Sequence, residues 1–131
     1  MVLGNPEQLA LLESIIHPVV ALERASFLER HAQDDILVFD IPLLFEKNAG
    51  GIVESIVVVS APADQQRERV LARPGMTEEK FESILKLQIP DAEKRKRADY
   101  IVENGGSMDE TRAQIAALVA DLRKTLASKA K

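Results

Sequence analysis

The residues that could do chemistry gather in a few short segments. Two carboxylates, Asp40 and Glu46, enclose the sequence Asp-Ile-Pro-Leu-Leu-Phe-Glu, directly after the apolar residues 36–39. Four apolar residues without alternation are typical of a strand that is buried on both faces of a sheet. Ligands of open α/β sheets gather outside the carboxyl ends of the strands. Asp40 is therefore a candidate to bind Mg²⁺ or its waters, and the alternative is that it caps the turn at Pro42.

A second group of candidate side chains is basic. Arg69 and Arg73 are four residues apart, so a helix would project both from one side, next to the Pro-Gly break at 74–75. Guanidinium groups in this place could close over phosphates and stabilise charge on a phosphoryl group in transfer. The alternative is ion pairing with Glu68 or Glu79 on a solvated face.

The composition narrows the class of protein. The 131 residues are 46% hydrophobic and 29% charged, which describes one globular domain. The chain has no cysteine, no secretory signal and no apolar run approaching the roughly 20 residues that span a bilayer, so we expect a cytoplasmic protein that is not bound to a membrane. The net charge is −4, although residues 67–97 hold nine of the 17 Lys and Arg residues. This basic segment can attract phosphates, but the acidic balance argues against nucleic-acid binding.

The elements that must position these residues alternate between helix and strand. Asn5 should cap a first helix, which Pro18 should interrupt before a second helix runs to about residue 33. Further helices are expected at 64–72, after a Thr77 cap, and after a capping box of Ser107 and Glu110, with a short crossover helix within 40–54. The expected strands are residues 36–39 and 56–59, both with the apolar pattern of a strand buried on two faces, and a short strand at 100–102. The first two, as parallel strands joined by a helical crossover, imply an α/β fold.

Several patterns occur in a particular order along the chain. They are His17-Pro18, the segment 40–46, Gln66-x-x-Arg69-Val70-x-x-Arg73-x-Gly75-Met76-Thr77, Gln88-x-Pro90, Lys94, Ala98-Asp99-Tyr100 and Asn104. Each pattern alone is weak, whereas their order and spacing together are specific. From about residue 2 to residue 126 the series resembles the dephospho-CoA kinase family.

The resemblance implies a partial P-loop, nucleoside-monophosphate-kinase-like parallel sheet with flanking helices. It implies a single domain with a helical coenzyme-binding part at about 5–33 and a lid at about 74–97. The ligands it implies are ATP, Mg²⁺ and dephospho-CoA. The implied site residues are Arg73 and Arg69 for catalysis, His17, Pro42, Leu43, Phe45 and Glu46 for the substrate, Lys94, Asn104 and Gln88 for the nucleotide, and Asp40 for the metal.

Some of these roles have structural alternatives that the sequence leaves open. His17 could hydrogen-bond the coenzyme or anchor a helix break beside Pro18. The Asn104 amide could bind the adenine edge or form the turn before two glycines. Gln66 and Gln88 could tie the two ends of the lid together or contact the nucleotide. The neighbours of Lys94 at positions 95–97 are expected to be solvated charges.

One part of the family pattern is missing from these residues. No Gly-x-x-x-x-Gly-Lys occurs in the 131 residues. In P-loop kinases this loop cradles the phosphates and helps to hold Mg²⁺. We therefore expect an N-terminally truncated kinase domain that does not catalyse efficiently by itself. Two further hypotheses are a non-catalytic interaction or regulatory module and another nucleotide kinase of the same fold, and the sequence leaves the oligomeric state open.

Overall fold

The structure is a computed structural model that describes residues 5–48 and 50–129. The chain divides into two compact units, Met1–Phe39 and Asp40–Lys131, and each is described by itself. No helix in the described part of the chain is both long and apolar enough to cross a bilayer.

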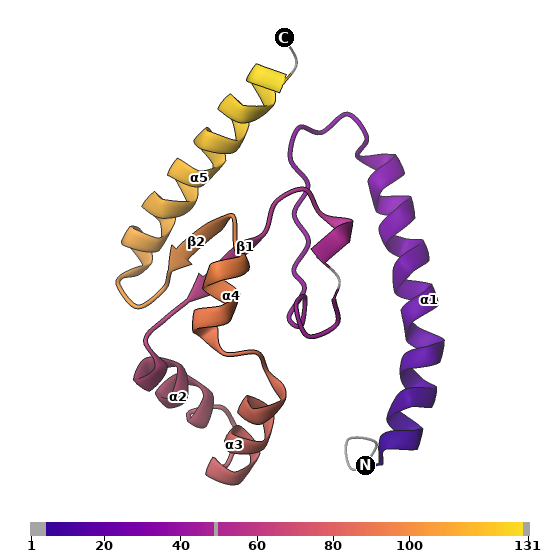
Figure 1. The fold of residues 1–131 in the computed structure, drawn as a ribbon, viewed down its shortest axis with the longest axis vertical. Helices are drawn as coiled ribbons and strands as arrows, with labels where there is room; N and C mark the ends of the chain where they lie inside the picture. Colours follow the sequence, from indigo (N-terminus) through magenta and orange to yellow (C-terminus); the bar gives the residue numbers. More distant parts are fainter. Residues whose placement is uncertain (1–4, 49, 130–131) are drawn as a thin grey trace. The chain divides into compact units, whose positions relative to one another are not determined.

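The first unit is built on one long helix, α1 (Pro6–Arg30; Figure 1). The Asn5 side chain caps it by accepting hydrogen bonds from the backbone N–H of Glu7 at 3.1 Å and of Gln8 at 3.3 Å, as expected. The expected break at Pro18 is wrong, because Pro18 lies inside the continuous helix. A proline removes one backbone hydrogen bond and disfavours the helical conformation at the preceding residue, but it does not exclude a continuous helix. The helix runs for 25 residues across this position.

The end of the first unit also differs from the expectation. Residues 36–39 form neither helix nor strand in the described structure, and the Val38 side chain is 80% exposed. A strand needs a neighbouring backbone for its N–H and C=O groups, and an apolar run cannot reveal whether one is present. Phe39 packs edge-on against Phe27 of α1, with ring centroids 5.7 Å apart.

The second unit contains a parallel sheet of two strands, β1 (Val57–Ser60) and β2 (Tyr100–Glu103). Its register pairs Val57 with Tyr100 and Ser60 with Glu103, so the carboxyl ends of both strands meet at one edge. The expected strands at 56–59 and 100–102 and the expected parallel sheet are confirmed, but the parallel partner of β1 is β2 and not residues 36–39. The expected burial on both faces is wrong for β1, because Val58 is buried whereas Val59 is 61% exposed.

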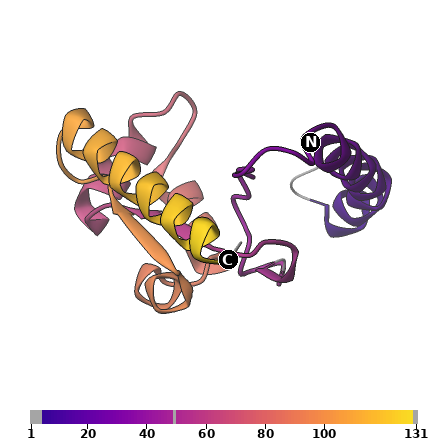
Figure 2. The same ribbon diagram turned by 90° about the horizontal axis from the view of Figure 1, so that it is seen from above.

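Helices connect and cover this sheet. Between the strands lie α2 (Ala63–Leu71), α3 (Glu78–Leu87) and α4 (Asp91–Arg97), and β2 is followed by α5 (Met108–Lys129). Helix α5 packs along β2, as both views show, and α4 packs on β1 (Figures 1 and 2). The expected crossover helix within 40–54 is replaced by turns and the short 3₁₀ helix η2 (Gly50–Ile52).

Local sequence signals set the ends of these helices. Gly75 has a φ of 76°, a left-handed conformation that suits glycine, and it separates α2 from α3. The Thr77 hydroxyl then caps α3 by accepting from the backbone N–H of Lys80 at 3.3 Å. At α5, Ser107 accepts from the Glu110 N–H at 3.2 Å while the Glu110 carboxylate accepts from the Ser107 N–H at 2.6 Å. The expected Thr77 cap and the capping box are both confirmed.

The capping box generates a stability prediction. Ser107→Ala removes the acceptor for the Glu110 N–H and should lower the free energy of unfolding by about 0.5–2 kcal/mol. Urea denaturation followed by circular dichroism measures the change. The matched control is Ser83→Ala, since that hydroxyl only donates to the Glu79 carbonyl within α3 and alanine favours helix. A Ser107→Ala loss no larger than the control's would contradict the capping role.

Candidate functional site

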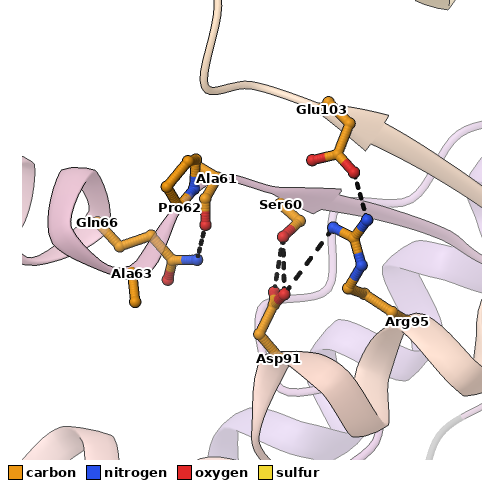
Figure 3. A pocket seen from close by; sticks show the side chains of 8 residues that line it. All are labelled: Ser60, Ala61, Pro62, Ala63, Gln66, Asp91, Arg95 and Glu103. Carbon is orange, nitrogen blue, oxygen red and sulfur yellow. Dashed lines mark hydrogen bonds and ion pairs between the residues drawn. The ribbon is translucent and has the colours of Figure 1, made fainter.

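A hollow of about 300 Å³ lies where the carboxyl ends of the two strands meet. Figure 3 shows its lining, which comes from the end of β1, the start of α2, helix α4 and the end of β2. Ser60, 3% exposed, donates its hydroxyl hydrogen to the Asp91 carboxylate, whose oxygens lie 2.9 and 2.8 Å away. Asp91 is the first residue of α4, so this contact joins the helix start to the strand end.

An ion pair closes the other side of the hollow. Arg95 of α4 binds the carboxylate of Glu103, the last residue of β2, and lies 4.0 Å from Asp91 (Figure 3). The hydrogen bond from Arg95 lowers the pKa of Glu103, and the same contact raises the pKa of Arg95. The Arg95 side chain is half-buried and is paired with Glu103. The expectation of a solvated charge at this position is wrong. The ionisable side chains of the hollow pair with one another, which makes this a rigid polar junction.

The start of α2 completes the hollow. The Gln66 side-chain amide donates to the Ala61 carbonyl at 2.7 Å, so in this structure Gln66 stabilises its own turn (Figure 3). The Asn104 backbone N–H donates to the Ser60 carbonyl at 2.6 Å and extends the pairing of the strands by one residue. A Cβ atom at Gly105 would lie only 2.6 Å from the Pro62 ring, so this close approach requires glycine. Asn104 thus lies at the edge of the sheet, next to the hollow.

The second cluster of charged groups is centred on Glu46. Its Oε1 accepts hydrogen bonds from the Lys94 ammonium and from the Ile89 backbone N–H, each at 3.0 Å. The side chains of Glu46 and Lys94 are only 11% and 19% exposed. Burial raises the pKa of Glu46, but hydrogen bonds from its own backbone N–H, from Lys94 and from Ile89 outweigh burial and hold the pKa below its ordinary value.

Phe45 makes the neighbouring contact with α4. The Arg97 guanidinium lies over the Phe45 ring, 5.8 Å from its centroid, a cation–π arrangement. The structure therefore brings Phe45 and Glu46, expected at the substrate, together with the lid helix that carries Lys94. The other Glu46 oxygen, Oε2, is buried without a hydrogen-bond partner in the described structure.

Arg69 lies in the last turn of α2, Arg73 lies just beyond its end, and both are exposed. Arg69 donates to the Gln65 side chain at 3.3 Å, and the Arg73 side chain has no partner among the described residues. Among the described residues, neither arginine forms the ion pair with Glu68 or Glu79 that was the alternative to a ligand role. Instead Arg67 pairs with Glu78 and Glu82 of α3, and its guanidinium lies 5.6 Å from the centre of the Phe81 ring.

The remaining candidates are not gathered into either cluster. His17 is exposed on α1 in the first unit, Pro42 and Leu43 are exposed in the turns of the second, and Gln88 ends α3. Their ligand roles stay predictions. Between residues 5 and 129, Ala49 apart, no three His, Cys, Asp or Glu residues come together in a way that could hold a metal ion. Asp40 is exposed and has no such cluster around it, and its role toward Mg²⁺ stays a prediction.

Four polar residues of the hollow are absent from the candidates that the sequence suggests: Ser60, Asp91, Arg95 and Glu103. Ser60 and Glu103 are the last residues of the two strands. Ligand sites of open α/β sheets lie at the carboxyl ends of the strands, so the positions of these two residues could have indicated them. Asp91 follows Pro90 at a helix start, which by itself indicates only capping. No local signal distinguishes Arg95 from its charged neighbours.

The fold and these clusters define an α/β protein whose polar groups gather at the carboxyl ends of parallel strands. The dephospho-CoA kinase family profile matches residues 1–110. A dephospho-CoA kinase from Novosphingobium aromaticivorans is 54% identical over 123 residues, which cover 94% of this chain and 61% of that relative. One from Rhizobium meliloti is 54% identical over 120 residues, covering 90% of this chain and 62% of the relative.

Solved structures agree with the sequence matches. A crystal structure of a Thermus thermophilus protein superposes with a TM-score of 0.71 at 37% identity, covering 92% of this chain and 63% of that one. The dephospho-CoA kinase from Campylobacter jejuni gives a TM-score of 0.64 at 26% identity, covering 95% and 62%. The chain belongs to the dephospho-CoA kinase family. It spans 61% to 63% of the length of the curated relatives named above and of these two structures.

The lowered pKa of Glu46 predicts how stability depends on pH. A carboxylate with a lowered pKa stabilises the fold above its unfolded pKa, near 4.5, and this contribution is lost as the pH falls through the folded pKa. Glu46→Gln should lower the free energy of unfolding at pH 7 and reduce the loss of stability on acidification below about pH 5. Urea titrations of both proteins between pH 3 and 7 measure this, and parallel curves would contradict it.

Proposed function

We propose that the protein transfers the γ-phosphoryl group of ATP to the ribose 3′-hydroxyl of dephospho-CoA, giving CoA and ADP, in the cytoplasm. In this step the hydroxyl oxygen forms a bond to the γ-phosphorus, the bond from that phosphorus to the β–γ bridging oxygen breaks, and the hydroxyl proton is released. The observation that carries the proposal is the 54% identity, over 94% of the chain, to a protein named dephospho-CoA kinase.

We assign different parts of the chain to different parts of this reaction. The segment 40–46 is the part that we assign to the coenzyme, with His17 as a further coenzyme contact from a helical part at about 5–33. Arg69 and Arg73 are assigned to the phosphoryl groups of ATP, and Asn104 and Gln88 to the nucleotide. Arg73 is exposed and has no partner in the described structure, so its guanidinium is available for an anionic ligand.

The charges of the reaction explain why such residues are needed. Negative charge is spread over the transferring phosphoryl group, so catalysis depends on positioning and on cationic groups. Mg²⁺ with ATP supplies part of this charge neutralisation in kinases of this kind. Within this chain, the arginines at the end of α2 are the cations that we assign to the task.

A chimera tests the proposed function. The relative from Novosphingobium aromaticivorans is 54% identical to this chain over 123 residues, so those residues can replace its matching segment. We expect the chimera to form CoA from dephospho-CoA and ATP in a coupled assay, within about tenfold of the parent relative's kcat. The 131-residue chain alone, which contains no Gly-x-x-x-x-Gly-Lys sequence, should give no turnover.

A folded chimera without activity would contradict the proposal and favour a non-catalytic module. Circular dichroism and a cooperative urea transition establish that the chimera is folded. Activity with another nucleoside or nucleotide in place of dephospho-CoA would instead favour a different kinase of the same fold.

The arginine assignment gives a separate prediction. In the chimera, Arg73→Ala should lower kcat by about 10²-fold or more with a smaller change in the KM for dephospho-CoA, because its charge acts mainly on the transition state. Steady-state kinetics with both substrates measure this. Arg112→Ala is a comparison variant, since Arg112 is exposed and pairs with Asp109 of its own helix. An unchanged kcat in Arg73→Ala would assign Arg73 to the solvated surface.

A further inference from the structure

We propose that Glu46 and Lys94 form a positioning pair, which holds the base of the lid against the segment 40–46 and contacts neither substrate. The inference rests on the proposed function, because it assigns the lid and the coenzyme segment to that reaction. It replaces two separate ligand roles, Glu46 at the substrate and Lys94 at the nucleotide, with one shared structural task.

The geometry of Glu46 carries the proposal. Its Oε1 accepts from Ile89 N–H and from Lys94 Nζ, each at 3.0 Å. Ile89 lies in the short connection between α3, which ends at Leu87, and α4, which begins at Asp91. One carboxylate oxygen therefore joins the segment 40–46 to both the connection and the helix that follows it.

Burial makes this contact costly to lose. With side chains 11% and 19% exposed, Glu46 and Lys94 are the least exposed of the ion pairs in the described residues. Removing one member of a buried pair leaves the other charge desolvated and unpaired. The Lys94 ammonium is also committed to Glu46 and is mostly covered, so a phosphate could reach it only by breaking the pair.

Helix α4 is held at its other contacts as well. Asp91 binds Ser60 at the end of β1, and Arg95 binds Glu103 at the end of β2 (Figure 3). Arg97 lies over Phe45. Side chains from four positions of one short helix thus tie it to both strands and to the coenzyme segment, which makes α4 a fixed base for the lid.

Helices α2 and α3, which precede this base in the chain, are held together differently. Arg67 of α2 pairs with Glu78 and Glu82 of α3 and lies over the Phe81 ring, so α2 and α3 form one piece. This piece carries Arg69 and Arg73. Because the connection at Ile89 joins the piece to α4, the Glu46 contact controls the place from which the arginines are presented. A small displacement there is enough to lower the rate of transfer.

Kinetics of a double-mutant cycle in the chimera distinguish a positioning pair from two ligand contacts. We expect Glu46→Gln and Lys94→Met each to lower kcat by about 10- to 100-fold, and the double variant to be no worse than either single one. Lys94→Arg should restore most of the rate, since it keeps the ion pair. Two separate ligand contacts would give a different result. Glu46→Gln would raise only the KM for dephospho-CoA, Lys94→Met would raise only the KM for ATP, and the two effects would multiply in the double variant. That outcome would overturn the proposal.

Hydrogen exchange on the 131-residue chain tests the pair without any activity. We expect the Ile89 amide to exchange at least tenfold faster in Glu46→Ala, which removes its acceptor, and the amides of α4 to exchange faster in Lys94→Met. The control is Lys96→Met, two positions along α4, whose exposed lysine pairs only with Glu93 on the same helix. Exchange equal to wild type in both test variants would overturn the proposal.

These two measurements separate failure of the inference from failure of the proposed function. An inactive but folded chimera contradicts the kinase activity, and the exchange rates then decide whether Glu46 holds the α3–α4 connection. If the chimera is active and the exchange rates of the variants are unchanged, the proposed function stands and the positioning role of Glu46 and Lys94 is contradicted.

Discussion

The parallel pairing of β1 and β2 is the constraint on which the second unit depends. Its register places Ser60 opposite Glu103, so the ends of two strands that are 40 residues apart in the chain form one edge. The three helices between the strands must return the chain to that edge. Their last member, α4, is the one that reaches both strand ends, through Asp91 and Arg95.

Around this edge few apolar side chains are buried, and polar contacts join the elements. Val58 and Val102 are the buried apolar residues in the described structure, and Ser60 and Thr111 are buried beside them. The polar contacts of α4 therefore carry much of the tertiary specificity. Because a partly buried charge is costly when unpaired, Glu46 and Lys94 favour one arrangement of the segment 40–46 and helix α4 over its alternatives.

The arrangement also gives the two groups of arginine and lysine residues different tasks. Lys94 and Arg95 are half-buried and paired, which suits them to hold α4 in place. Arg69 and Arg73 are exposed at the end of α2 and form no ion pair in the described part of the chain, which suits them to meet an anionic ligand. Charge alone does not distinguish the groups, and only burial and pairing do.

The sequence by itself determined the signals that act over a few residues. Caps at Asn5, Thr77 and Ser107, the break at Gly75, the strands β1 and β2 and the family resemblance all follow from local chemistry and order along the chain. Only the tertiary structure decided that residues 36–39 lack a strand neighbour among the described residues, that α1 continues through Pro18, and that Glu46 meets Lys94 across 48 positions. The physical reason is that pairing, burial and desolvation depend on which distant groups meet, and local spacing does not record this.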